Sequence, residues 1–111
     1  MDAVDVSFLV NTICLGNYAE AESLITETLI TLNEIEFITV ENEKLAKKTI
    51  HNVAGSCGLM GLNSWSKELS EIECDLIDNQ AYNKSNERLN NIKNEVRKTI
   101  FFIKAGSIKD E

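Results

Sequence analysis

Residues 64–78 read SWSKELSEIECDLID, and their apolar side chains recur with the period of an α-helix. The large apolar residues are Trp65, Leu69, Ile72 and Leu76, in steps of four, three and four. Steps of this size place all four side chains on one face of a helix. A helix with a single apolar face must bury that face against other elements, so the stretch predicts one member of a helical domain.

Four further segments show the same period. Near the N-terminus, one side of the first segment carries Val6, Leu9 and Ile13. The apolar residues of the second segment are Tyr18, Ala21, Leu24, Ile25, Leu29 and Leu32, and those of the last segment are Leu89, Ile92, Val96, Ile100 and Ile103. Together with 64–78, the helices that we expect span residues 3–15, 18–35, 41–61 and 83–105.

The segments between these helices are short. Residues 36–42 are β-rich but have no visible partner strand, so we interpret them as a loop, and residues 79–81 form a second connection. Gly106 is expected to end the last helix, and residues 107–111 to fray. One-faced helices with short connections predict an all-α fold, an antiparallel up-down four-helix bundle with a short extra N-terminal helix.

The composition agrees with a single helical domain spanning residues 1–111. Of the 111 residues, 43% are hydrophobic and 26% are charged, which excludes wholesale disorder. The chain has no proline and only five glycines, too few for the frequent turns of a β-sandwich or barrel. The longest apolar run, residues 100–103, is far too short to cross a membrane, and no signal peptide is visible.

The charge and the cysteines restrict the possible partners. The formal net charge of −7 disfavours phosphate backbones and anionic membranes, so we expect no nucleic-acid and no membrane binding. Cys14, Cys57 and Cys74 have no CxxC spacing, which favours reduced thiols in a cytoplasmic protein. With one histidine in the chain, no metal site is expected.

The segment 41–61 places its histidine on the face away from the core. At roughly 100° per residue, His51 falls opposite the apolar arc of this helix. The residues of the predicted core arc are Leu45, Ala46, Thr49, Ile50, Val53, Ser56, Cys57 and Met60, with Ile50 at its edge. The residues predicted beside His51 on the outward face are Lys44, Lys47, Lys48, Ala54, Gly55 and Gly58.

This outward face is unusual in two ways. Glycine inside a helix costs about 1 kcal/mol relative to alanine, yet Gly55 and Gly58 lie within the periodic pattern. Small residues at positions 54, 55 and 58 would leave the imidazole open to an approaching macromolecule. Three of the chain's 11 basic residues also cluster here, at Lys44, Lys47 and Lys48, where they could support an anion.

An exposed imidazole is largely neutral at pH 7, so one of its ring nitrogens is a free nucleophile. Attack on an acyl phosphate would give a phosphoramidate whose phosphoryl group can be passed on. No Asp or Glu lies at a helical spacing that would make His51 a strong general base, and no Ser or Cys lies one turn away on its face. A hydrolytic dyad is therefore not supported.

A structural interpretation of the same residues exists. A lone surface histidine beside solvated lysines often has no function, and Gly58 and Gly61 could instead permit close helix packing. Cys57 and Trp65 are better explained as core residues than as chemistry.

The stretch His51-Asn52-Val53-Ala54-Gly55-Ser56, followed by Gly61, Leu69 and Ile72-Glu73, resembles the histidine phosphotransfer (HPt) domain of two-component phosphorelays. The resembling motif covers about a quarter of the chain. The resemblance implies a four-helix bundle in which His51 accepts a phosphoryl group from a receiver aspartate and passes it to another receiver. It also implies that the protein is a phosphocarrier and not an enzyme with its own ATP site.

The implied partners are response-regulator receiver domains and a hybrid sensor histidine kinase. No cofactor is expected in this chain, because the receiver supplies Mg²⁺ and most of the catalysis in that family. We expect the protein to be a monomer.

One position departs from the HPt pattern. The family usually has a lysine or arginine three residues after the histidine, where this chain has Ala54. Our hypothesis is that Lys47 or Lys48, one turn before His51, takes over the support of the phosphate.

Two alternatives remain open. The chain could be a non-catalytic helical docking or adaptor module that binds receiver-like acidic partners, or a structural bundle that oligomerises. The first would keep its binding when His51 is replaced. The second requires an exposed apolar stripe, and every predicted stripe is used in one core.

Overall fold

The computed structural model describes residues 5–79 and 82–109. A short π-helix, η1 (Leu9–Ile13), precedes four α-helices. These are α1 (Tyr18–Asn33), α2 (Glu43–Leu59), α3 (Asn63–Asn79) and α4 (Tyr82–Lys109). None of the described residues lies in a strand, which confirms the all-α prediction and the loop at 36–42.

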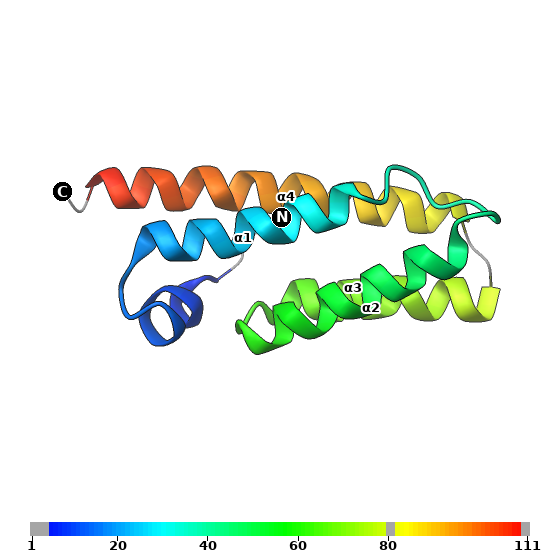
Figure 1. Ribbon diagram of the computed structural model, residues 1–111, viewed down its shortest axis with the longest axis horizontal. Coiled ribbons are helices and arrows are strands. Elements are labelled where there is room, and N and C mark those ends of the chain that lie inside the picture. Colours follow the sequence, from blue (N-terminus) through cyan, green and yellow to red (C-terminus); the bar gives the residue numbers. More distant parts are fainter. Residues whose placement is uncertain (1–4, 80–81, 110–111) are drawn as a thin grey trace.

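The four α-helices pack antiparallel in two close pairs. Helix α1 lies along α4, and α2 lies along α3 (Figure 1). At 1.5 Å per residue, the 28 residues of α4 extend about 42 Å, which is most of the 48 Å length of the molecule. The α1–α2 contact is less extensive than either pair, and this leaves a groove between those two helices.

The core consists of the apolar faces that the sequence predicts for three of the helices. Trp65, Leu69, Ile72 and Leu76 of α3 are all buried. Helix α1 buries Ala21, Ile25 and Leu32, and α4 buries Leu89, Ile92, Val96 and Ile103. No helix in the described part of the chain is both long and apolar enough to cross a membrane.

The N-terminal helix ends before the predicted residue 15, and the predicted residues 3–4 lie outside the described residues. The π-helix η1 covers residues 9–13, and Ile13, expected on the apolar side with Leu9, is exposed. Leu15 and Gly16 both have a positive φ, of 51° and 85°, and two successive left-handed residues cannot continue a right-handed helix. Asn17 then caps α1 by accepting a hydrogen bond from the backbone N–H of Glu20 at 3.0 Å.

The last helix is longer than predicted. Helix α4 continues through Gly106 to Lys109, so Gly106 does not end it and residues 107–109 are helical. Glycine lowers helix stability by about 1 kcal/mol but removes no backbone hydrogen bond, so a single glycine does not stop a long helix. The predicted 79–81 connection differs as well, because Asn79 belongs to α3, and residues 80–81 lie outside the described residues.

Helix α2 ends in a tight turn that only glycine fits. Gly61 has a φ of 76°, and its N–H bonds to the carbonyl of Gly58 while that of Leu62 bonds to Cys57. A Cβ added to Gly61 would lie 2.5 Å from Cδ1 of Phe8. This turn therefore fixes where α3 begins relative to α2.

The loop between α1 and α2 is held against α4 by side chains. Asn86 accepts a hydrogen bond from the N–H of Ile38 at 2.7 Å and donates one to the carbonyl of Ile38 at 3.0 Å. Buried Lys93 donates to the carbonyl of Ile35 at 2.5 Å, and burial lowers the pKa of this lysine. These bonds satisfy backbone groups of a loop that buries Ile35 and Ile38.

Replacing Asn86 with alanine is expected to destabilise the protein by about 1–3 kcal/mol, because two backbone groups of Ile38 lose their partner. Urea unfolding followed by circular dichroism measures this loss. The matched control is Asn90→Ala on the same helix, where the side chain is exposed and a change within about 0.5 kcal/mol is expected. Equal stability of the two variants would contradict the anchoring role.

Candidate functional site

Helix α2 is turned about its axis relative to the prediction. Its buried residues are Ala46, Ile50, Val53, Ala54 and Cys57. Leu45 is 67% exposed and Ser56 is exposed, so their assignment to the core is wrong, while Ile50 is fully buried. The buried arc is shifted by about 60° from the predicted one.

The shift follows from the side of α2 that meets α3. Ala54 is 4% exposed, and its carbonyl accepts a hydrogen bond from Oγ of Ser66 at 2.8 Å. A Cβ on Gly58 would lie 3.3 Å from Oγ of Ser66. Small residues at 54 and 58 let α3 approach closely. Ala54 is buried, so its placement on the open face is wrong, whereas Gly58 is exposed.

Gly55 differs from these two neighbours. A Cβ added there would meet nothing within 4 Å. The open space that the sequence predicts one turn after His51 is therefore present at Gly55 alone among the three small residues.

His51 lies on the surface beside the α2–α3 contact. Its side chain is 72% exposed, and its Nδ1 is 3.1 Å from Oε1 of Glu73 on α3. A carboxylate oxygen can only accept, so Nδ1 carries the hydrogen of this bond. In the neutral ring the lone pair is then on Nε2.

No acidic partner for His51 lies at a helical spacing within α2, because the carboxylate that pairs with it belongs to another helix. Glu73 comes from the next helix, 22 residues later. The sequence feature that could have predicted the pairing of His51 with Glu73 is the short turn at 60–62. In an antiparallel pair, residues at similar distances before and after the turn face each other, and His51 and Glu73 are about ten and twelve residues from Gly61.

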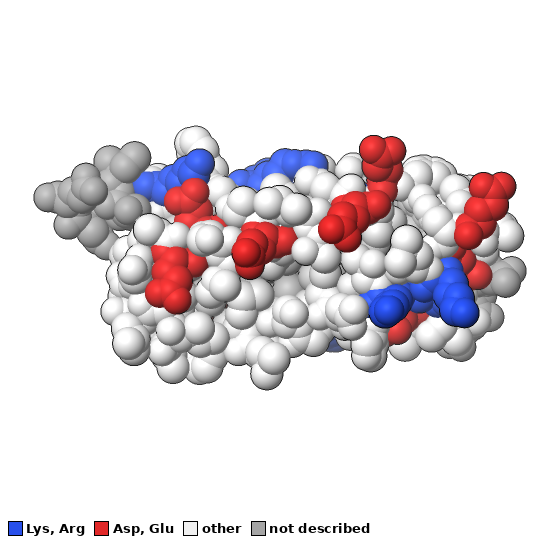
Figure 2. All heavy atoms as spheres, viewed as in Figure 1, with Lys and Arg blue, Asp and Glu red and all other residues white. Residues whose placement is uncertain are grey.

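The three lysines lie before His51 on α2. Lys44 and Lys48 are exposed and Lys47 is partly buried. Within residues 5–79 and 82–109, none of the three forms an ion pair. Figure 2 shows basic side chains gathered over the first half of α2, whereas acidic ones follow α1. The surroundings of His51 on its own helix are therefore locally basic.

A cavity of about 370 Å³ lies in the groove between α1 and α2. Asn52 and Ser56 line it from α2, and Leu24 and Glu27 line it from α1. Asn52 follows His51 directly in the sequence, but His51 itself does not line the groove.

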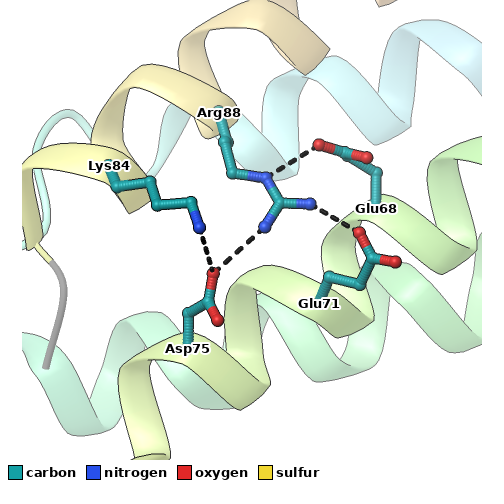
Figure 3. A network of polar contacts seen from close by, with 5 residues as sticks. All are labelled: Glu68, Glu71, Asp75, Lys84 and Arg88. Atoms are coloured by element: carbon teal, nitrogen blue, oxygen red, sulfur yellow. Dashed lines mark hydrogen bonds and ion pairs between the residues drawn. The ribbon is translucent and has the colours of Figure 1, made fainter. Parts of the chain in front are cut away.

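A second charged cluster holds α3 against α4. Arg88 of α4 donates to Glu68 at 2.9 Å, to Glu71 at 2.6 Å and to Asp75 at 3.1 Å (Figure 3). The bond to Glu68 is the largest of the effects that raise the pKa of Arg88 above its ordinary value.

The cluster also fixes the face of α3 that bears Glu73. Glu68, Glu71 and Asp75 recur at three- and four-residue steps, so they share the face toward α4. Glu73, two residues from the second and third of them, points instead toward α2 and His51.

The cysteines do not form a reactive centre. Cys14 and Cys57 are buried, and burial raises the pKa of the Cys57 thiol to about 11. Cys74 is exposed. In the part of the chain that the structure describes, no three His, Cys, Asp or Glu residues are grouped to hold a metal ion.

Comparison of the chain with family models, with curated proteins and with solved structures finds no match. The fold and the site define the class of protein as an all-helical domain of four main helices that presents one exposed histidine, paired with a carboxylate, beside basic residues.

Proposed function

We propose that this chain is a histidine phosphotransfer (HPt) protein or domain. It accepts a phosphoryl group on His51 from a receiver aspartate and passes it to another receiver in a multistep phosphorelay. The observation that carries the proposal is the His51–Glu73 contact, which holds the exposed ring with Nδ1 bonded and Nε2 free. A nucleophile that is both exposed and oriented is what transfer between two proteins requires.

The chemistry needs little else from this chain. Nε2 attacks the phosphorus of an aspartyl phosphate, the P–N bond forms, and the aspartate leaves as a carboxylate with the electrons of the broken P–O bond. The receiver supplies the Mg²⁺ that stabilises the transferring group. Open space at Gly55 admits the receiver, and the groove beside Asn52 adds contact surface.

The basic residue that the HPt family usually has three positions after the histidine is absent. Ala54 occupies that position, and its uncharged, buried side chain gives the phosphoryl group no electrostatic support. Lys47 and Lys48 lie one helical turn before His51 and are the nearest lysines along α2 to the phosphoryl group.

Lys48→Ala is expected to shorten the lifetime of the phosphorylated protein or to slow transfer by about two- to fivefold, which is the range for loss of one exposed charge contact. Decay of a ³²P label and single-turnover transfer measure the two effects. Lys47→Ala tests the neighbouring lysine in the same way. The matched control is Lys98→Ala on α4, an exposed lysine far from position 51 in the sequence. Rates equal to the control in both variants would refute the replacement of the missing basic residue.

The second candidate is a docking module without phosphotransfer. The observation that favours it is the same buried Ala54, which leaves the phosphate with less charge support than the family pattern provides. Such a module would bind receivers through α2 and would take up no phosphoryl group.

A labelling experiment separates the two candidates. A receiver preloaded with ³²P-phosphate is mixed with the protein and Mg²⁺, and the label is followed by gel electrophoresis. The chain has one histidine, so acid-labile, base-stable label identifies phosphorylated His51 directly. Label on the protein supports the carrier, while receivers that bind without transfer support the docking module.

A further inference from the structure

A second cavity, the loop–α4 cavity, lies between the α1–α2 loop and the first half of α4, which run side by side (Figure 1). Its volume is about 360 Å³, within the range of about 300–1,000 Å³ that is usual for small-molecule sites. Neither His51 nor Glu73 lines it. The lining residues that carry its chemistry are Glu36, Phe37, Asn83, Glu87, Asn90 and Lys93.

Lys93 brings a buried amine to the loop side of this cavity. The residue is 7% exposed, and its Nζ donates to the carbonyl of Ile35 at 2.5 Å. Glu36 and Phe37 follow Ile35 in the chain and line the cavity, so the ammonium group lies at this wall. A lysine ammonium has three N–H donors, and the bond to Ile35 uses one of them. Two donors therefore remain for a ligand.

The charge of Lys93 has no close counterion. Within residues 5–79 and 82–109, no carboxylate lies within ion-pair distance of its Nζ. Burial lowers the pKa of Lys93 most, Arg97 lowers it further, and Glu36 opposes both from a distance. A buried charge is costly unless it is paired, so this ammonium group suits an anionic group that enters the cavity.

Two amide side chains beside Lys93 are also free. Asn83 and Asn90 precede Lys93 by ten and three residues, which places all three on one face of α4. Both asparagines are exposed, and in the described part of the chain neither side chain forms a hydrogen bond. Asn86, which lies between them, is occupied by Ile38. The free amide N–H groups can donate to the same anionic group as Lys93.

The rim of the cavity carries the opposite charge. Glu36 of the loop and Glu87 of α4 are exposed, and neither forms an ion pair with any residue that the structure describes. Beside Glu36, the 56% exposed ring of Phe37 offers an apolar surface. Two rim carboxylates repel a multiply charged anion such as phosphate, while Lys93 repels a simple amine. A ligand that matches both ends has one anionic and one cationic group.

We propose that the loop–α4 cavity binds a small zwitterion, a free α-amino acid. The ligand carboxylate accepts hydrogen bonds from Lys93 and Asn90, its ammonium group donates to Glu36 or Glu87, and its side chain lies against Phe37. No covalent bond forms or breaks, so the ligand leaves unchanged. Phosphoryl transfer and amino-acid binding use different residues, so either can fail without the other.

Isothermal titration calorimetry of the full chain tests the site. Each common α-amino acid is titrated, and the one that binds best is compared with the same molecule without its amino group, the same molecule without its carboxyl group, and inorganic phosphate. We expect each single-charge analogue to bind at least about tenfold more weakly than the amino acid. A Kd above about 1 mM for every amino acid would overturn the proposal. Equal binding of a single-charge analogue, or tighter binding of phosphate, would overturn it as well.

Substitutions of exposed residues test the two ends of the site separately. Asn90→Ala is expected to weaken amino-acid binding about fivefold without a loss of stability. Glu87→Gln should weaken it by about the same factor and should strengthen binding of the analogue without an amino group, because a charge that repels the lone carboxylate is gone. The matched control is Glu34→Gln, an exposed glutamate near Glu36 that does not line the cavity. Affinities equal to this control in both variants would overturn the proposal.

Lys93→Met removes the inner charge and keeps most of the packing of the lysine stem. We expect it to weaken amino-acid binding at least about tenfold. The carbonyl of Ile35 loses its donor in this variant, so circular dichroism is used to check that the protein folds. Wild-type affinity in folded Lys93→Met would overturn the proposal. If the variant does not fold, the Asn90 and Glu87 variants decide the question.

Discussion

Replacing His51 with glutamine is expected to abolish acid-labile phosphorylation completely, because the chain contains no other histidine. Glutamine is similar in size and polar, but its amide nitrogen is not a nucleophile. The side chain is 72% exposed, so the stability of the protein should change by no more than about 0.5 kcal/mol. Label transfer from a preloaded receiver and thermal unfolding measure the two quantities on the same samples.

The same variant distinguishes carrier from docking module. A relay that requires this protein should fail with His51→Gln if the chain is a carrier, and should continue if the chain only binds. Receiver binding, measured by calorimetry, should persist in both cases because the surface around position 51 is retained. Acid-labile label on His51→Gln would contradict the assignment of the phosphoacceptor.

Replacing Arg88 with methionine is expected to destabilise the protein by about 2–3 kcal/mol at pH 7. Arg88 is 19% exposed and bonds three carboxylates, so its loss leaves Glu68, Glu71 and Asp75 facing one another without their shared cation. Methionine keeps most of the packing of the arginine stem, which restricts the change mainly to the charge. Urea unfolding followed by circular dichroism gives the free energy.

Arg97→Met on the same helix is the matched control. Arg97 is exposed, and its bond to Asn94 at 2.9 Å is a surface contact worth little. If the two arginine variants were equally stable, the Arg88 cluster would have no special role in holding α3 against α4. This cluster orients α3, which carries Glu73. A loosened α3 in Arg88→Met should therefore also broaden the ¹⁵N resonances of the His51 imidazole.

Local periodicity was enough to predict all four main helices and the buried faces of three of them. The 4-3-4 step from Trp65 to Leu76 survives unchanged because each of these side chains is large, apolar and lies on the middle of its helix face. The ends of helices were harder to predict. Gly106 fails to stop α4, whereas Leu15 and Gly16 stop the first helix through their backbone conformation.

The candidate site was predicted only in part. The exposure of His51 and the open space at Gly55 follow from position along α2. The burial of Ala54 and the close approach of Ser66 to Gly58 do not, because small residues are equally suited to an open face and to a close helix contact. That ambiguity shifted the predicted arc of α2 away from the observed one.

The sequence by itself determined the helical class, the buried stripes of α1, α3 and α4, and a single exposed histidine in a basic turn of α2. These depend on the chemistry of neighbours within one helix, where the α-helical period is fixed by the backbone. The tertiary structure alone decided the rotation of α2 and the meeting of His51 with Glu73. Both depend on how closely α2 and α3 pack through Ala54, Gly58 and Ser66, and contact between helices is a property of the packed chain, which no period within one helix encodes.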